Sequence, residues 1–153
     1  MAKTYVVERS QIINAAPEAL FEQIANLRNW TRWSPWEKLD SNMEKSYEGE
    51  DGIVGSTYAW KGNKKVGEGK MTLAKLEGTD AVTVELAFIK PFKALSSSRF
   101  ALTPEANGTK IVWTMTGQHN WLSKVMGVFM NMDKMLGKDF DEGLNNLKTL
   151  VEA

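Results

Sequence analysis

The sequence of 153 residues contains no cysteine, a single histidine, four prolines and no excess of charge of either sign. The absence of cysteine excludes disulfide bonds, thiolate metal sites and a cysteine nucleophile. Lysine plus arginine total 19, as do aspartate plus glutamate, so the chain lacks the basic excess that binding to nucleic acid phosphates requires. We therefore expect no nucleic acid partner.

Long apolar stretches are also missing from the sequence. No segment approaches the roughly 20 apolar residues that span a membrane. Residues 1–10 alternate with charges and lack the apolar run of a signal peptide. We therefore expect no integral membrane segment and a cytoplasmic location. The length fits one domain over 1–153, which buries about 68–70% of the surface that the unfolded chain exposes.

Strand-like alternation dominates the first part of the chain. Residues 4–14 are rich in β-branched side chains and predict a first strand, although their alternation does not show which face is buried. Polarity then alternates with a period of two, between turn-like segments, in 56–61, 66–76, 81–89, 96–102 and 111–116. One apolar face on each segment is typical of an antiparallel sheet with one face on a core.

Two short helices are predicted after the first strand. Pro17 suits the first helical position, and Glu18 follows in the first turn, where the helix dipole favours a negative charge. A second brief helix is expected near Leu27–Arg32, ending before Pro35.

The C-terminal region changes to helical periodicity. From Trp121 to Val151, apolar residues step by three or four over about eight helical turns. Gly127, Gly137 and Gly143 lie inside this stripe and each costs up to about 1 kcal/mol relative to alanine, so the segment is expected to bend or break. A break near residues 131–133 would leave a short helix followed by a long terminal one.

A sheet with one apolar face and a helix with one apolar stripe bury these surfaces against each other. The expected fold is therefore α+β. It consists of a curved antiparallel sheet of about seven strands wrapped around the long C-terminal helix, with the two short helices after the first strand. Gly67 and Gly69 fall on the inward face of one strand, where glycine suits a bend.

Three segments of the sequence, in this order along the chain, are similar to segments of a known family. They are I-I-N-A-A-P-E-A-L-F at Ile12–Phe21, W-T-R-W-S-P-W at Trp30–Trp36, and D-F-D-E-G-L-N-N-L-K-T-L-V-E at Asp139–Glu152. Together they resemble the START-like helix-grip superfamily (SRPBCC), in its polyketide cyclase/dehydrase and lipid-transport branch. The resemblance implies a helix-grip fold with a deep apolar cavity between the sheet and the terminal helix. It implies no single chemistry, because the superfamily includes carriers, cyclases, hydroxylase subunits and chaperone regulators.

Inward aromatic and methionine side chains are the candidates for lining such a cavity. Each aromatic side chain buries about 150–250 Å², and methionine adapts to irregular apolar shapes. The methionines between residues 126 and 135, with glycines nearby, also suggest a movable lid, although plain core filling is the alternative. The expected ligand-binding residues are Trp36, Tyr58, Trp60, Met71, Phe88, Phe100, Trp113, Met115, Met126, Phe129, Met130 and Phe140.

The tryptophan-rich segment is expected to close one end of the core. Trp30 and Trp33 are three residues apart, so they share a face if that turn is helical. We expect these two to pack as a plug, and Trp36, beyond Pro35, to reach the cavity rim.

No catalytic constellation stands out in the sequence. His119 is the only histidine, so a histidine-based metal site would need carboxylates for all its other ligands. We expect neither a metal nor a cofactor. If the chain is an enzyme, Tyr58 or His119 is the candidate for proton transfer, although His119 also fits an ordinary strand-end residue. Ser96 and Ser98 either line the cavity or fill a tight strand.

Three functions remain open at this point. The first is the binding of a small hydrophobic molecule that is lipid-like, polyketide-like or isoprenoid-like. The second is a cyclase/dehydratase-type enzyme without metal that uses the same cavity. The third is an interaction module, such as a chaperone regulator or stress-response protein. We favour the first because apolar inward residues are abundant, and we expect a monomer or a weak homodimer.

Overall fold

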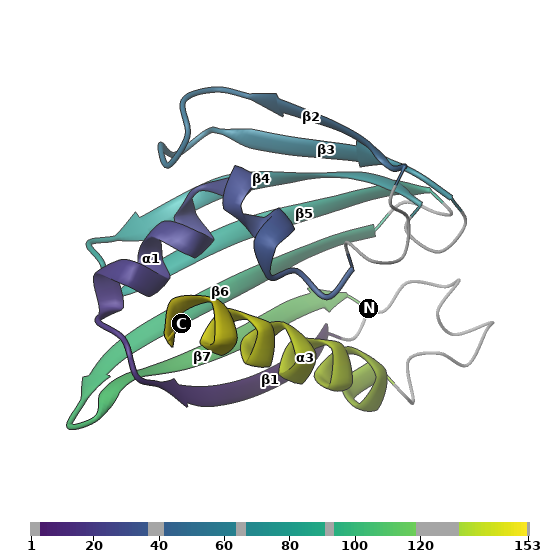
Figure 1. The fold of residues 1–153 in the computed structure, drawn as a ribbon. Coiled ribbons are helices and arrows are strands. Elements are labelled where there is room, and N and C mark those ends of the chain that lie inside the picture. Colours follow the sequence, from purple (N-terminus) through teal and green to yellow (C-terminus); the bar gives the residue numbers. More distant parts are fainter. Residues whose placement is uncertain (1–3, 37–41, 64–66, 91–93, 119–131, 153) are drawn as a thin grey trace.

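The computed structural model describes residues 4–36, 42–63, 67–90, 94–118 and 132–152. One face of a seven-stranded antiparallel sheet carries the helices (Figure 1). The elements in chain order are β1 Thr4–Ile13, α1 Pro17–Ala25, the 3-10 helix η1 Leu27–Arg32, β2 Glu44–Glu48, β3 Thr57–Lys61, β4 Glu68–Glu77, β5 Ala81–Lys90, β6 Ala94–Glu105, β7 Gly108–Gln118 and α3 Met132–Glu152. The predicted α+β helix-grip fold is confirmed.

The strand order is β1-β7-β6-β5-β4-β3-β2, so β2 to β7 form a meander and β1 joins its last strand. Helix α1 packs on β5 and β6, and α3 packs mainly along β1. Both helices therefore cover the same face of the sheet, which is the inner face. None of the described helices is both long and apolar enough to cross a membrane.

Strand β2 is the element that the sequence pattern did not locate. Four of its five residues are exposed, so it lacks the half-buried alternation that marks the other strands. It is an edge strand that pairs only with β3 among the described strands, and Tyr47 of β2 lies opposite Tyr58. The turn-like run Gly49-Glu50-Asp51-Gly52, which stands before the predicted strand at 56–61, was the available signal for a hairpin.

The ambiguous polarity of β1 has a structural reason. Its outward face presents Val6 and Ile12, which are 58% and 52% exposed. Its inward face includes Arg9, which lies over Gly137 of α3 so closely that a Cβ atom there would collide with the guanidinium. The guanidinium also lies 3.7 Å from the carboxylate of Asp141. The inward face of β1 therefore contacts α3 partly through a charged side chain, which interrupts the apolar alternation that would have marked this face as buried.

The glycines of α3 mark close approaches, and the helix continues through both of them. A Cβ atom at Gly143 would lie 3.1 Å from Pro35 Cδ and 3.1 Å from Trp113 Cζ3. Helix α3 is described from Met132 onward, so the predicted break near residues 131–133 stays a prediction. The shorter helix predicted before it falls in 119–131, outside the described residues.

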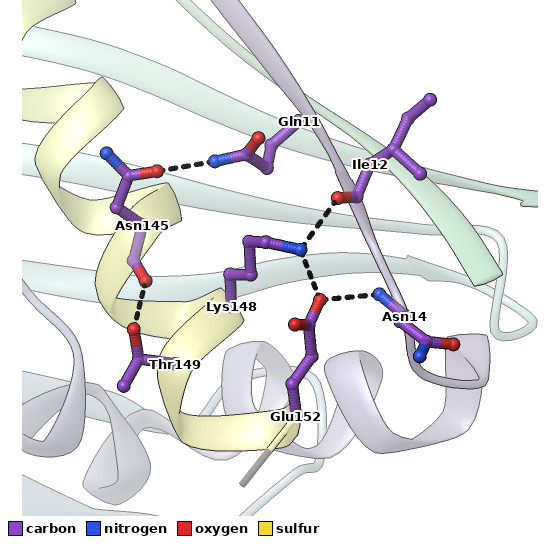
Figure 2. Close-up of polar contacts among 7 residues, drawn as sticks. All are labelled: Gln11, Ile12, Asn14, Asn145, Lys148, Thr149 and Glu152. Atoms are coloured by element: carbon purple, nitrogen blue, oxygen red, sulfur yellow. Dashed lines mark hydrogen bonds and ion pairs between the residues drawn. The ribbon is translucent and has the colours of Figure 1, made fainter. Parts of the chain in front are cut away.

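The end of α3 is fastened to the end of β1 by side-chain hydrogen bonds (Figure 2). Gln11 Nε2 donates to Asn145 Oδ1 at 2.6 Å, and the backbone N–H of Asn14 donates to Glu152 Oε2 at 2.7 Å. Lys148 donates to the same carboxylate. The hydrogen bonds from Lys148 and from Asn14 lower the pKa of Glu152 below its ordinary value. The first and last described elements are thus joined directly.

Candidate ligand-binding face of the sheet

The inner face of the sheet carries the side chains that the alternation predicted. Cross-strand register places Tyr58, Met71, Leu86, Ser96 and Gly117 in one row from β3 to β7. The next rows toward the covered end contain larger buried side chains, among them Leu73, Val84, Phe100 and Trp113. The strands therefore present a continuous apolar surface to the helices.

One end of this surface is filled by aromatic rings. Trp30 and Trp33 of the tryptophan-rich segment are 3% and 1% exposed, with ring centroids 4.6 Å apart. Both meet Phe100 and Trp113 edge-on. Their indole N–H groups donate to the backbone carbonyls of Ile24 and Gln23 at 2.8 Å and 3.0 Å. The pair thus acts as the hydrophobic plug that its spacing predicted.

Trp36 lies at the border of the filled end and remains half-buried. Its ring meets Trp113 and Phe140 edge-on, with centroids 5.9 Å and 6.4 Å away. Its Nε1 donates to Asp139 Oδ2 of α3 at 3.2 Å. The side chain therefore bridges the plug and the terminal helix.

The opposite end of the inner face is less completely covered. Trp60, Leu86 and Phe88 are half-buried there, and the rings of Trp60 and Phe88 meet edge-on with centroids 5.6 Å apart. Tyr58 is 5% exposed and its ring centroid lies 5.9 Å from that of Trp60. Together with Met71 and Ser96, which lie in the same row as Tyr58 and Leu86, these side chains form what we call the open row group: Tyr58, Trp60, Met71, Leu86, Phe88 and Ser96.

Gly69 explains how the ring of Trp60 fits into this group. The two residues face each other across β3 and β4. A Cβ atom at Gly69 would lie 2.7 Å from Trp60 Cη2 and 2.8 Å from the carbonyl oxygen of Ala87. Glycine at this position therefore serves close packing of an aromatic ring on the sheet.

Two polar atoms on the inner face are buried without a hydrogen-bond partner, Ser96 Oγ and Trp113 Nε1. The Trp113 indole lies inside the ring cluster at the filled end. The Ser96 hydroxyl lies in the open row group, opposite Leu86 and Gly117. The inner face is thus apolar with a small number of polar groups, which is the composition of many small-molecule sites.

The structure separates the predicted ligand residues into two sets. Phe100, Trp113 and Phe140 are at most 1% exposed and pack among rings at the filled end, with Trp36 at its border. Tyr58, Trp60, Met71 and Phe88 come together in the open row group. Met115 is 5% exposed and lies opposite Ser98, between the two sets. The remaining candidates lie outside the described residues: His119, Met126, Phe129 and Met130.

The expected ligand-binding residues did not include Leu86 or Gly117, and Ser96 was left open between lining the cavity and filling a tight strand. The alternation of 81–89 and 96–102 already placed Leu86 and Ser96 on the inward faces, so the signal for them was present. Gly117 gave no comparable signal, because a residue without a side chain contributes nothing to an apolar pattern. Its place opposite Ser96 depends on the register of β6 and β7.

Two further features of the described residues bear on where a site can lie, namely the placement of the carboxylates and a depression away from the open row group. Within the described ranges, no three acidic or histidine side chains cluster so that they could hold a metal ion. A depression of about 520 Å³ lies where the end of β1, the turn between β6 and β7, and Lys148 of α3 meet. It is lined by Ile12, Asn14, Ala106, Asn107, Gly108 and Lys148, and by none of the predicted ligand residues.

The curved antiparallel sheet, its C-terminal helix and its apolar inner face define a START-like helix-grip protein. Over residues 4–152, the chain matches the profile of the family described as polyketide cyclase/dehydrase and lipid transport. The chain belongs to this family. No curated protein matches the chain.

Solved structures share the fold at low sequence identity. A protein from Chromobacterium violaceum is 12% identical with a TM-score of 0.70, and the match covers 97% of both chains. The di-domain ARO/CYC StfQ of the steffimycin biosynthetic pathway is 10% identical with a TM-score of 0.72, over 97% of this chain and 51% of StfQ. The Aha1 dimer from Colwellia psychrerythraea is 18% identical with a TM-score of 0.64, over 97% and 96%.

Proposed function

We propose that the chain binds a small hydrophobic molecule between the open row group and the terminal helix. The observation that carries this proposal is the contrast along the inner face. Rings fill one end completely, whereas Trp60, Leu86 and Phe88 stay half-buried at the other. Half-buried apolar side chains that lie together on a concave sheet gain from further burial at roughly 25 cal/mol per Å².

The family and the fold support the same function. The family description names both lipid transport and polyketide cyclisation, and StfQ, an ARO/CYC protein, has this fold. Both descriptions concern apolar or partly apolar molecules. A lipid-like, polyketide-like or isoprenoid-like ligand is therefore the class to test first.

The experiment measures the binding of one probe from each class to the purified protein. We suggest a fatty acid, the aromatic polyketide emodin and the isoprenoid alcohol farnesol, with native mass spectrometry for stoichiometry and thermal shift for stabilisation. At least one probe is expected to bind with a stoichiometry of one and to raise the melting temperature. If none binds and none stabilises the protein, the proposal is wrong.

A matched pair of variants locates the bound probe. Leu86→Trp adds bulk to the inner face, whereas Leu95→Trp adds the same bulk at a position that is 75% exposed. Leu86→Trp is expected to weaken binding by about tenfold or more, which corresponds to about 1.4 kcal/mol. Leu95→Trp is expected to leave it unchanged. If both variants changed the affinity for the probe equally, the probe would not bind on the inner face of the sheet.

A second candidate function is a cyclase/dehydratase-type reaction on the bound molecule. The supporting observation is the buried phenol of Tyr58 beside Trp60 on the inner face, together with the family description. A phenol can transfer a proton to a substrate that lies within hydrogen-bond reach. Tyr58→Phe is then expected to abolish turnover of a linear polyketone while leaving its binding intact. If the Tyr58→Phe variant kept full activity, the Tyr58 phenol would not be the group that transfers the proton.

A further inference from the structure

The hydroxyl of Ser96 is a buried polar group that the protein leaves without a partner. Ser96 Oγ has no hydrogen-bond partner and is shielded from solvent. A hydroxyl that is removed from water and not hydrogen-bonded again makes folding less favourable. Most buried polar groups are satisfied, so an exception on the inner face calls for a physical reason.

The cross-strand neighbours of Ser96 offer its hydroxyl no polar side chain. Gly117 on β7 lies opposite and has no side chain, and Leu86 on β5 lies on the other side. Met71 and Tyr58 continue the same row across β4 and β3. A molecule that lies on this row would therefore meet apolar side chains along most of its length and a hydroxyl at the Ser96 position.

The row also restricts the charge of the group that meets this hydroxyl. None of its five residues carries a charge. The inward arginine of β1, Arg9, is in register with Trp113 at the filled end of the face. An ionised carboxylate at Ser96 would lose its hydration without gaining a counter-charge from this row, which is costly in an apolar setting. An uncharged oxygen meets no such cost.

We propose that Ser96 donates a hydrogen bond to an uncharged oxygen, such as that of a ketone or ester, on the hydrophobic ligand. The inference rests on the proposed function and adds the ligand's polar group and the residue that receives it. The hydroxyl gains in the complex the partner that it lacks in the free protein. An apolar molecule with a carbonyl group is thus preferred over the corresponding hydrocarbon and over the corresponding carboxylate.

Three probes that share one apolar body test this preference: naphthalene, 2-acetylnaphthalene and 2-naphthoate. Their dissociation constants are measured at pH 7 by equilibrium dialysis for the wild-type chain, for Ser96→Ala and for Ser97→Ala. Ser97 is the matched control because it is the next residue of β6 and faces outward, opposite Glu85 and Thr116. The melting temperature of each ligand-free protein is measured as well.

The wild-type chain is expected to bind the ketone about threefold to tenfold more tightly than naphthalene, the effect of one net hydrogen bond. Ser96→Ala should abolish this preference without weakening naphthalene binding, and Ser97→Ala should retain it. The ligand-free Ser96→Ala protein should melt no lower than the wild type. A preference unchanged in Ser96→Ala overturns the inference, as does tighter binding of the naphthoate or a clearly lower melting temperature. If none of the three naphthalene probes binds although the fatty acid, emodin or farnesol does, this inference fails and the proposed function stands.

Discussion

The indole of Trp113 and the ring of Phe140 lie parallel, with their centroids 4.0 Å apart and their planes at 5°. Trp113 belongs to β7 and Phe140 to α3, so the stack joins the sheet to its C-terminal helix. Both side chains are buried to 1% exposure or less. Offset stacking adds about 0.5–1.5 kcal/mol to the burial of such a pair.

Phe140→Ala is expected to lower the free energy of unfolding by about 3–5 kcal/mol, because it leaves a cavity against Trp113. Phe140→Leu keeps most of the volume and should cost about 1 kcal/mol. Urea denaturation followed by circular dichroism measures both values. Equal losses for the two variants would contradict the cavity against Trp113 as the cause of the destabilisation.

Alanine at the two helix glycines should give opposite outcomes. Gly143 faces Pro35 and Trp113, which are rigid and buried, so Gly143→Ala should cost about 1–3 kcal/mol by overpacking. Gly137 faces the end of the flexible Arg9 side chain, which can move aside while the helix gains up to about 1 kcal/mol. Urea midpoints of the two variants test this order. A Gly137→Ala protein less stable than Gly143→Ala would contradict it.

The hydrogen bond from Trp36 to Asp139 should couple the tryptophan-rich segment to α3. Its distance of 3.2 Å and partial exposure suggest a coupling energy of about 0.5–1.5 kcal/mol. A double-mutant cycle with Trp36→Phe and Asp139→Ala isolates this energy from the loss of ring area. Strictly additive effects of the two substitutions would show that the bond contributes nothing.

Low pH should weaken the hydrogen bonds by which Glu152 joins the end of α3 to the end of β1. The pKa of Glu152 is lowered in the folded state by its hydrogen bonds to Lys148 and Asn14. Its stabilising contribution is therefore complete above the unfolded pKa, near 4.3, and is lost as the pH falls through the lower folded value. The stability difference between the wild type and Glu152→Gln should thus be constant from pH 7 to about pH 5.5 and shrink in strong acid.

Urea denaturation across this pH range, with the exposed Glu105→Gln as control, measures the effect. The control variant is expected to show no such loss relative to the wild type. A difference between wild type and Glu152→Gln that grows toward pH 2 would contradict the assignment.

Periodicity was sufficient to predict the sheet and its inner face. The alternation of 81–89 put Val82, Val84, Leu86 and Phe88 on one side, and the register of β5 with its neighbours places them there. The short helix at Leu27–Arg32 has its predicted bounds, because Pro35 follows closely. Strand β2 was missed because its stability comes from pairing with β3 and little from burial.

The site was less predictable than the fold, since it depends on which inward side chains remain uncovered. Phe100 and Phe88 are equally apolar and both face inward, yet only Phe100 is enclosed by Trp30 and Trp33. Alternation assigns a face to a residue and says nothing about its neighbours across the core. The unpaired hydroxyl of Ser96 required the register of three strands as well.

The hydrogen bond between Asn14 and Glu152 spans 138 positions of the chain. Contacts of such sequence separation form late and slow the folding reaction, because a long loop must close before they can contribute. During synthesis the strands of the sheet are made before α3, so their apolar face cannot yet pack against this helix. Until that helix leaves the ribosome, Trp113 and its neighbours remain without their cover, and the nascent chain is open to aggregation and to chaperone binding.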